Sequence, residues 1–377
     1  MHELRHQPLR RLYLLYDALS TRLIRTPIWL IHSLISFWRP RPAWSWERSF
    51  KFLMLRRAWI VQDKVGPPPG NPAQHTFLNL KEERKSGPTV KAVWVDPVPD
   101  QIHGNIAQWA ENAKVQPVRI PVYWMDQSGL DISIGEALQP NEKILYRMHG
   151  GCYVALSAHP DSPIAPLSKG FLESYEPFRR AFAIEYRLST TSPHPPTNHF
   201  PTARRKSRPR SHPLSRRAEA HRGAGNVPPP PSALILMSPW TDLGDSHDGP
   251  NTSMETRKHC DSLGAIPGRL DYAKKAFLGP FGKDFAELNP YISPGSLASF
   301  PSFVGFPKTF INAGGAEIFL DQIRKLGDRM VADMGEGDSP GTVRYYEAPE
   351  GIHVYPGYEW FEPERSETLR RIASWLG

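Results

Sequence analysis

The sequence predicts an α/β protein whose core is a mostly parallel β-sheet flanked by helices. Short apolar segments alternate with segments of helical periodicity, as where residues 308–315 are followed by 316–334. Residues 233–237 are apolar throughout, which is typical of a strand buried on both faces of a parallel sheet. The chain has 377 residues, which is enough for one large domain and an appendage.

The net charge of +8 depends on one segment of the chain. Residues 204–222 hold eight basic residues and one acidic residue, and the rest of the chain holds 38 basic and 37 acidic residues. The basic segment has no aromatic residues between its arginines, whereas single-strand binders use such residues to stack on bases. We therefore expect no nucleic-acid partner.

Two cysteines, Cys152 and Cys260, are too few for a disulfide framework or a zinc knuckle. We expect two free or buried thiols, and the sequence indicates neither a cofactor nor a metal site.

Residues 1–65 are predicted to form an amphipathic helical segment, because apolar residues recur there at roughly helical spacing. The longest uncharged run, residues 26–38, has 13 residues, whereas a membrane-spanning helix needs about 20. Three interpretations stay open: contact of residues 10–38 with a membrane surface, a cap over an acyl pocket, and a helix packed on the domain. No secretory signal is expected, and the sequence leaves the compartment open.

The main domain is predicted to span residues 66–377, after a Gly/Pro cluster at 66–72. Its expected strands are 91–96, 118–125, 144–148, 181–188, 232–238, 308–315 and 343–348, and its main helices are 164–178, 316–334 and 364–376. Pro121 places the second of these strands at an edge of the sheet, because proline cannot donate to the ladder.

The chemistry is expected where strands end, because active residues of open α/β sheets lie on loops at the carboxyl ends of the strands. His149-Gly150-Gly151 directly follows the strand at 144–148. Free backbone amides in such a glycine turn can hold the oxyanion that forms during acyl transfer. Glu317 and His353 follow two later strands, so the chain order is oxyanion loop, acid, histidine.

Six motifs give the chain a resemblance to the hormone-sensitive-lipase branch of the α/β-hydrolases, close to steryl acetyl hydrolases and lipase-like esterases. They are His149-Gly-Gly-Cys-Tyr, Glu185-Tyr-Arg-Leu, Leu236-Met-Ser-Pro-Trp-Thr-Asp-Leu, Asn289-Pro-Tyr-Ile-Ser-Pro, Ala313-Gly-Gly-Ala-Glu-Ile-Phe-Leu-Asp and Gly351-Ile-His353. The resemblance covers about residues 88–377. It implies an α/β-hydrolase fold and carboxylic-ester hydrolysis.

The resemblance also implies roles for individual residues. Gly150, Gly151 and Cys152 would supply oxyanion amides, although relatives usually have Gly or Ala where Cys152 stands. His353 would be the general base and Glu317 would orient it, with Asp321 as the alternative acid one helical turn later. Without the resemblance, Glu317 reads as a carboxylate that stabilises a helix N-terminus, and His353 as a loop histidine without a partner.

The nucleophile that the resemblance requires is missing. Relatives carry Gly-x-Ser-x-Gly on a sharp turn between a strand and a helix, and this chain has no such string. Between the strands at 181–188 and 232–238 stands an Arg/Pro-rich stretch, for which we expect a disordered insert at 196–231. The domain is thus expected to lack the regular nucleophile-elbow strand and helix.

Three explanations compete for the missing nucleophile. The stretch at 203–226 is a gene-model error from a shifted frame or a mispredicted splice, or the protein is a genuine pseudoenzyme, or another residue is the nucleophile. Ser246 and Cys152 are weak candidates for the third, because the glycine spacing around Ser246 is wrong and Cys152 lies on the oxyanion loop itself. The first two are favoured.

The expected function is therefore that of an esterase or lipase-like hydrolase of a small-molecule ester, such as a steryl or other acetyl ester, inactive as the sequence stands. The alternative is a lipid- or acyl-binding pseudoenzyme that keeps the pocket without the chemistry.

Overall fold

The computed structural model describes residues 3–66, 89–200 and 230–377. The Gly/Pro cluster at 66–72 lies outside these ranges except for Gly66, and the insert expected at 196–231 lies outside them except for residues 196–200 and 230–231. The expectation of disorder was wrong for residues 196–200, because Thr197 pairs with Thr190 and Phe200 is buried.

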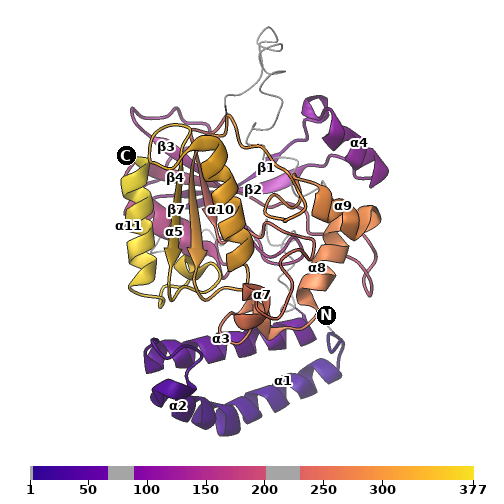
Figure 1. The fold of residues 1–377 in the computed structure, drawn as a ribbon, viewed down its shortest axis with the longest axis vertical. Helices are drawn as coiled ribbons and strands as arrows, with labels where there is room; N and C mark the ends of the chain where they lie inside the picture. The colour runs from indigo at the N-terminus through magenta and orange to yellow at the C-terminus, as the bar shows by residue number, and fades with distance from the viewer. Residues whose placement is uncertain (1–2, 67–88, 201–229) are drawn as a thin grey trace.

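The β-structure consists of two sheets (Figure 1). The first has the order β1-β2-β4-β3, and the second has the order β5-β6-β7. The strands are β1 (Val90–Val95), β2 (Ile120–Asp126), β3 (Lys143–Met148), β4 (Phe178–Ile184), β5 (Ala233–Met237), β6 (Lys308–Gly314) and β7 (Val343–Ala348). β3 is parallel to β4, and β5, β6 and β7 are parallel to one another, whereas β2 is antiparallel to both of its neighbours.

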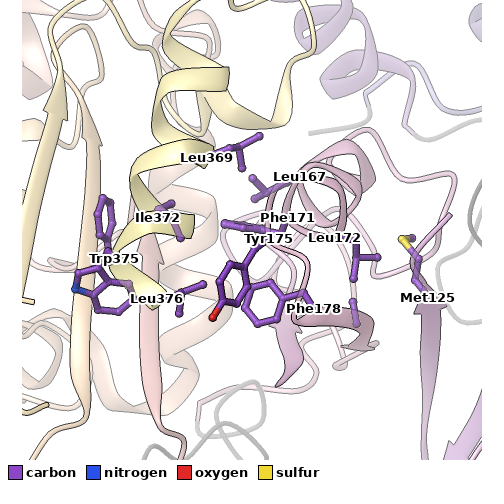
Figure 2. Packing of buried hydrophobic residues seen from close by; sticks show 12 residues of the cluster. Met125, Leu167, Phe171, Leu172, Tyr175, Phe178, Leu369, Ile372, Trp375 and Leu376 are labelled. Atoms are coloured by element: carbon purple, nitrogen blue, oxygen red, sulfur yellow. The ribbon is translucent and has the colours of Figure 1, made fainter. Parts of the chain in front are cut away.

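Helix α5 (Ala165–Ser174) connects β3 to β4, which forms the parallel strand–helix–strand unit expected from the sequence. The C-terminal helix α11 (Glu364–Leu376) packs beside α5, and Figure 2 shows Leu369, Ile372 and Leu376 directed at Leu167, Phe171 and Tyr175. Leu145 of β3 and Ile235 of β5 both pack against this cluster. One hydrophobic core therefore serves both sheets.

Strands β3 and β5 each have one unpaired edge. Within the described ranges β3 pairs only with β4 and β5 only with β6, and no described strand lies between β4 and β5 along the chain. Ile144, Tyr146 and Met148 are 38%, 44% and 46% exposed, so one side of β3 is uncovered. Parallel strands normally have both faces buried, so this part of the fold lacks a covering element among the described residues.

Three expectations about individual elements were wrong. The strand expected at 181–188 lies earlier in the chain, as β4 (Phe178–Ile184). β2 is not an edge strand, because it lies between β1 and β4. Pro121 is tolerated there because it stands opposite Glu185, just past the end of β4, where the ladder between the two strands finishes. The helix expected at 316–334 begins later, as α10 (Leu320–Met334), after a tight turn at 315–319.

The N-terminal helices form a separate layer at one end of the molecule (Figure 1). They are α1 (Leu9–Ser20), a π-helical turn η1 (Thr21–Arg25), α2 (Thr26–Leu34), a 3-10 turn η2 (Ser36–Trp38) and α3 (Trp46–Val65). α3 lies between the domain and the pair α1 and α2 (Figure 1). The remaining helices are α4 (Asn105–Asn112), α7 (Ser253–Thr256), α8 (Arg269–Leu278) and α9 (Gly282–Leu288).

Candidate active site

The oxyanion-type loop leaves β3 at Met148 and turns sharply at Gly151. The Gly151 carbonyl accepts hydrogen bonds from the amides of Val154 and Ala155, both at 3.0 Å. Gly151 has φ of +110°, and a Cβ at this position would lie 2.0 Å from the Ala155 carbonyl oxygen. Only glycine fits this turn, because both the backbone conformation and the space exclude a side chain.

His149 and Tyr186 stabilise the conformation of this loop. Their rings stack with centroids 4.0 Å apart, and the Tyr186 hydroxyl donates to the His149 carbonyl oxygen at 2.7 Å. Nδ1 of His149 lies 2.7 Å from the Gly150 carbonyl oxygen. Burial lowers the pKa of His149 to about 3, so the imidazole is neutral and Nδ1–H is the donor in this contact.

The amides of Gly150, Gly151 and Cys152 donate no hydrogen bond to any group in the described part of the chain. Such unused backbone donors at a strand end are what an oxyanion requires. The Cys152 thiol does not take part in this way, because burial raises its pKa to about 11 and keeps it protonated. Cys152 is therefore placed to offer its backbone rather than a thiolate nucleophile.

Glu317 and His353 lie side by side at the carboxyl ends of β6 and β7. Nδ1 of His353 is 3.0 Å from Oε2 of Glu317. Oε1 of Glu317 accepts hydrogen bonds from the Gly314 amide at 2.6 Å and the Ser238 hydroxyl at 3.1 Å. The interpretation of Glu317 as a helix N-terminal carboxylate was wrong, because Glu317 lies in the turn before α10 and is fully buried.

Close backbone contact fixes the two loops that carry this pair. The Ala316 amide donates to the Gly351 carbonyl oxygen at 2.8 Å, and a Cβ on Gly314 would lie 2.3 Å from that same oxygen. The glycines of Ala313-Gly-Gly and Gly351-Ile-His353 thus let the acid loop and the histidine loop meet backbone to backbone.

The pKa of His353 is higher than that of a free histidine. Burial opposes the charge, but the hydrogen bond and the charge of Glu317, together with the charge of Asp261, outweigh it and raise the pKa of His353. Burial raises the pKa of the Glu317 carboxyl, against the lowering effect of His353. A carboxylate that supports an imidazolium in this way is the partner that a general-base histidine needs.

Two supporting residues were not found from the sequence. Ser238 follows β5 with a positive φ of 45°, donates to Glu317 and accepts from the Val354 amide at 3.0 Å, so it joins the acid to the histidine loop. Asp261 is buried and accepts from the Ile318 amide at 2.7 Å. The motif that begins at Leu236 includes Ser238 and could have indicated it, whereas no motif marks Asp261.

The other candidates have different partners. The Asp321 carboxylate accepts from the Ser253 amide at 2.7 Å, which docks the short helix α7 on α10. The Ser246 hydroxyl donates to Asp242 at 2.7 Å and accepts from the Leu297 amide at 2.9 Å. The structure thus pairs His353 with Glu317 and engages Asp321 and Ser246 in other contacts.

The buried Asp261 lies near both the oxyanion loop and the histidine. Burial raises the pKa of the Cys152 thiol and the charge of Asp261 adds to this effect, and at His353 the same charge adds to the larger effect of Glu317. His353 also packs edge-on against Phe319 with ring centroids 5.4 Å apart, and Phe319 stacks on Trp240. Phe319 is fully buried and supports the His353 ring from the core, whereas Trp240 is partly exposed.

Behind the oxyanion loop lies a buried carboxyl, that of Glu185. Oε2 accepts from the Ser157 hydroxyl at 2.6 Å and the Ala158 amide at 2.7 Å, whereas Oε1 is 3.8 Å from Nε2 of His149. Because the His149 Nδ1–H is used on Gly150, its Nε2 presents a lone pair to this oxygen. A protonated carboxyl suits this position better than a carboxylate.

We expect Glu185→Gln to flatten the pH dependence of stability. Burial raises the pKa of Glu185 from an ordinary value of 4.5 to about 7. The stability that depends on the neutral carboxyl is complete below the ordinary pKa and is lost as pH rises through 7. Denaturant unfolding of the native chain should therefore show a loss of about 3 kcal/mol between pH 4 and 8 that Glu185→Gln removes. Glu176→Gln, an exposed control, should keep that loss, and an equal pH slope in both variants would contradict the assignment.

Comparison with known proteins agrees with this architecture. A family model described as the alpha/beta hydrolase fold matches residues 211–356. A hormone-sensitive lipase from a metagenome library is 18% identical, and the match covers 86% of this chain and 97% of that one with a TM-score of 0.53. An esterase from the bacterial hormone-sensitive lipase family is 17% identical, covering 86% of this chain and 95% of that one with a TM-score of 0.50. No curated protein matches the chain.

The paired acid and histidine at strand ends, the glycine loop after β3 and these matches lead to one assignment. The chain has the α/β-hydrolase fold, and the solved structures that it resembles include esterases and lipases of the hormone-sensitive-lipase-like branch.

Proposed function

We propose that this fold carries the remnant of a carboxylic-ester hydrolase site. The observation that supports it most is the contact between Glu317 and His353, with Nδ1 and Oε2 3.0 Å apart. In the reaction a serine hydroxyl attacks the ester carbonyl, His353 takes its proton, and the amides of Gly150 and Gly151 stabilise the oxyanion. Glu317 keeps the imidazole in the tautomer whose Nε2 can accept that proton.

The described residues place no nucleophile beside His353. Among residues 3–66, 89–200 and 230–377, no hydroxyl or thiol hydrogen-bonds to His353, and Ser238, the nearest serine along this network, donates to Glu317 instead. We therefore infer that the polypeptide is inactive or nearly so as an esterase.

Hydrolysis of a short p-nitrophenyl ester by the purified chain tests this inference. We expect the native chain and a His353→Ala variant to give the same background rate, because without a nucleophile the general base has no proton to take. Turnover by the native chain well above that of His353→Ala would mean that a nucleophile is present and that the inactive assignment is wrong.

The substrate class that we propose is an apolar ester, such as a steryl or other acetyl ester. Phe319 is fully buried behind His353, and Trp240, which is partly exposed, stacks on Phe319 with ring centroids 5.4 Å apart, so Trp240 is the ring that an acyl chain near the histidine would contact. This ring supports an apolar acyl group without distinguishing among alcohols.

The second candidate function is binding of an acyl or lipid ligand without turnover. It is favoured by the unused oxyanion amides, the assembled acid–histidine pair and the lack of a nucleophile beside His353 among the described residues. Calorimetry with butyrate would show saturable binding that Gly150→Asp weakens, and no heat of binding would exclude this candidate.

The gene-model explanation has its own test, because it concerns DNA rather than protein. Residues 203–224 should be read in the other two frames and in the adjacent introns. A Gly-x-Ser-x-Gly string in one of them would identify the chain as a damaged copy of an active hydrolase, and its absence would favour the pseudoenzyme.

Contact of residues 10–38 with a membrane surface is likewise a proposal. It is supported by the exposure of the apolar side chains on α1 and α2, and none of the described helices is long and apolar enough to cross a membrane.

A further inference from the structure

The N-terminal layer has a domain-facing side and an outer side. α3 contributes Phe52 to a buried cluster with Ile352 and Phe361 of the domain. α1 and α2 lie on the far side of α3 from the domain, at the end of the molecule (Figure 1). The outer surface of α1 and α2 therefore faces away from the domain.

The exposed surface of residues 9–38 is strongly apolar. Fifteen large hydrophobic side chains between Leu9 and Trp38 are exposed. The most exposed are Phe37 at 84%, Leu23 at 69% and Leu12 at 60%. Monomeric soluble proteins rarely expose a contiguous apolar patch of this kind unless it binds something.

The charge of the chain is distributed unevenly around this patch. Outside residues 204–222 the basic and acidic residues nearly balance, but residues 1–66 contain twelve basic and four acidic residues, and the remainder contains 26 basic and 33 acidic residues. Several N-terminal arginines are used internally, as where Arg57 pairs with Asp17. Arg11 and Arg22 are exposed on α1 and η1, among the apolar residues. An apolar face with arginines at its border suits an anionic lipid surface, since the acyl boundary takes the apolar side chains and the headgroups take the charge.

The N-terminal layer also contacts the loop that carries His353. Arg41 makes a bidentate contact with the Glu350 carboxylate at 2.7 and 2.6 Å, and Nε1 of Trp44 donates to the Glu350 carbonyl oxygen at 3.2 Å. Glu350 precedes His353 by three residues. On the other side, Arg56 of α3 donates to the carbonyl oxygens of Lys258 and His259, next to Asp261. The outer apolar face thus lies one helix layer away from the loops of the candidate site.

We propose that the outer face of α1, η1, α2 and η2 is an in-plane docking surface for an anionic lipid bilayer. The helices lie along the membrane interface, and the carboxyl edge of β6 and β7 faces the lipid across α3. This inference does not depend on ester hydrolysis, so it stands or falls separately from the proposed function.

Co-sedimentation with vesicles tests the proposal on the purified full chain. Phosphatidylcholine vesicles are compared with vesicles that also contain phosphatidylserine. We expect the chain to pellet with both, and more strongly with the anionic ones. Phe37→Asp and Leu23→Asp should each weaken the apparent affinity at least about tenfold, because each removes a large apolar group from the acyl boundary and adds a charge there. Since both side chains are exposed, neither change should disturb folding, which circular dichroism can verify.

The matched control is Phe300→Asp, because Phe300 is 88% exposed but lies on the domain rather than on the N-terminal layer. It should bind vesicles as the native chain does. Arg11→Gln combined with Arg22→Gln should weaken binding to the anionic vesicles and leave binding to phosphatidylcholine unchanged.

Equal loss of binding in Phe37→Asp and Phe300→Asp, or no pelleting of the native chain, would overturn the proposal. So would a dimer in sedimentation velocity that Phe37→Asp dissociates while vesicles do not bind, since a second copy of the chain would then cover the patch.

Discussion

Replacing residues 189–232 with the strand, Gly-x-Ser-x-Gly elbow and helix of a solved hormone-sensitive-lipase-like structure is expected to raise ester turnover by at least about a thousandfold. The gain is large because the nucleophile is the one component of the acyl-transfer site that the described chain lacks. The oxyanion loop and the Glu317–His353 pair are already in place. The measurement is the initial rate on a short p-nitrophenyl ester, against the ungrafted chain.

The fold supplies a place for the grafted strand. β3 and β5 each have a free edge within the described ranges, and both contribute to the core formed by α5 and α11. Ile144, Tyr146 and Met148 of β3 are partly exposed and would be covered. A graft whose elbow serine is replaced by alanine is the control, because it keeps the packing and loses the chemistry. Equal rates with and without the elbow serine would show that the graft does not restore a hydrolase.

Changing Glu317 is expected to have the second-largest effect. Glu317→Gln should lower the pKa of His353, because the amide cannot supply the charge that raises it. Glu317→Ala should in addition cost about 3–5 kcal/mol of unfolding free energy, because the Gly314 amide and the Ser238 hydroxyl lose their common acceptor in a buried place.

The measurement for Glu317 is a pH titration of the His353 ring signals by NMR, together with denaturant unfolding. Glu350→Gln is the matched control, because Glu350 lies on the same loop as His353 but binds Arg41. A His353 titration that does not move in Glu317→Gln, or moves equally in Glu350→Gln, would mean that Glu317 does not orient the histidine.

The ends of the strands could be predicted from the sequence, because apolar strands and glycine turns are local features of the chain. The expected strand at 343–348 coincides with β7, and the helix at 364–376 coincides with α11. The chain order of loop, acid and histidine follows from the resemblance, and the structure pairs Glu317 with His353.

Other features depend on contacts between distant segments, which sequence patterns do not record. Pro121 marked β2 as an edge strand, but β4 ends opposite it, so an interior position costs little. Ser238 and Asp261 reach the acid loop from segments that are far away along the chain. The N-terminal helices fitted both a packed helix and a membrane-facing helix, and the structure shows α3 packed on the domain with α1 and α2 exposed.

The central claim is that the amides after His149 and the imidazole of His353 belong to one acyl-transfer site. It is tested most directly by the p-nitrophenyl ester turnover of the grafted chain with and without His353→Ala. We expect the substitution to remove the restored turnover by at least about a thousandfold. Equal turnover in the two grafted chains would show that His353 is not the general base of that site, and the hydrolase assignment would be contradicted.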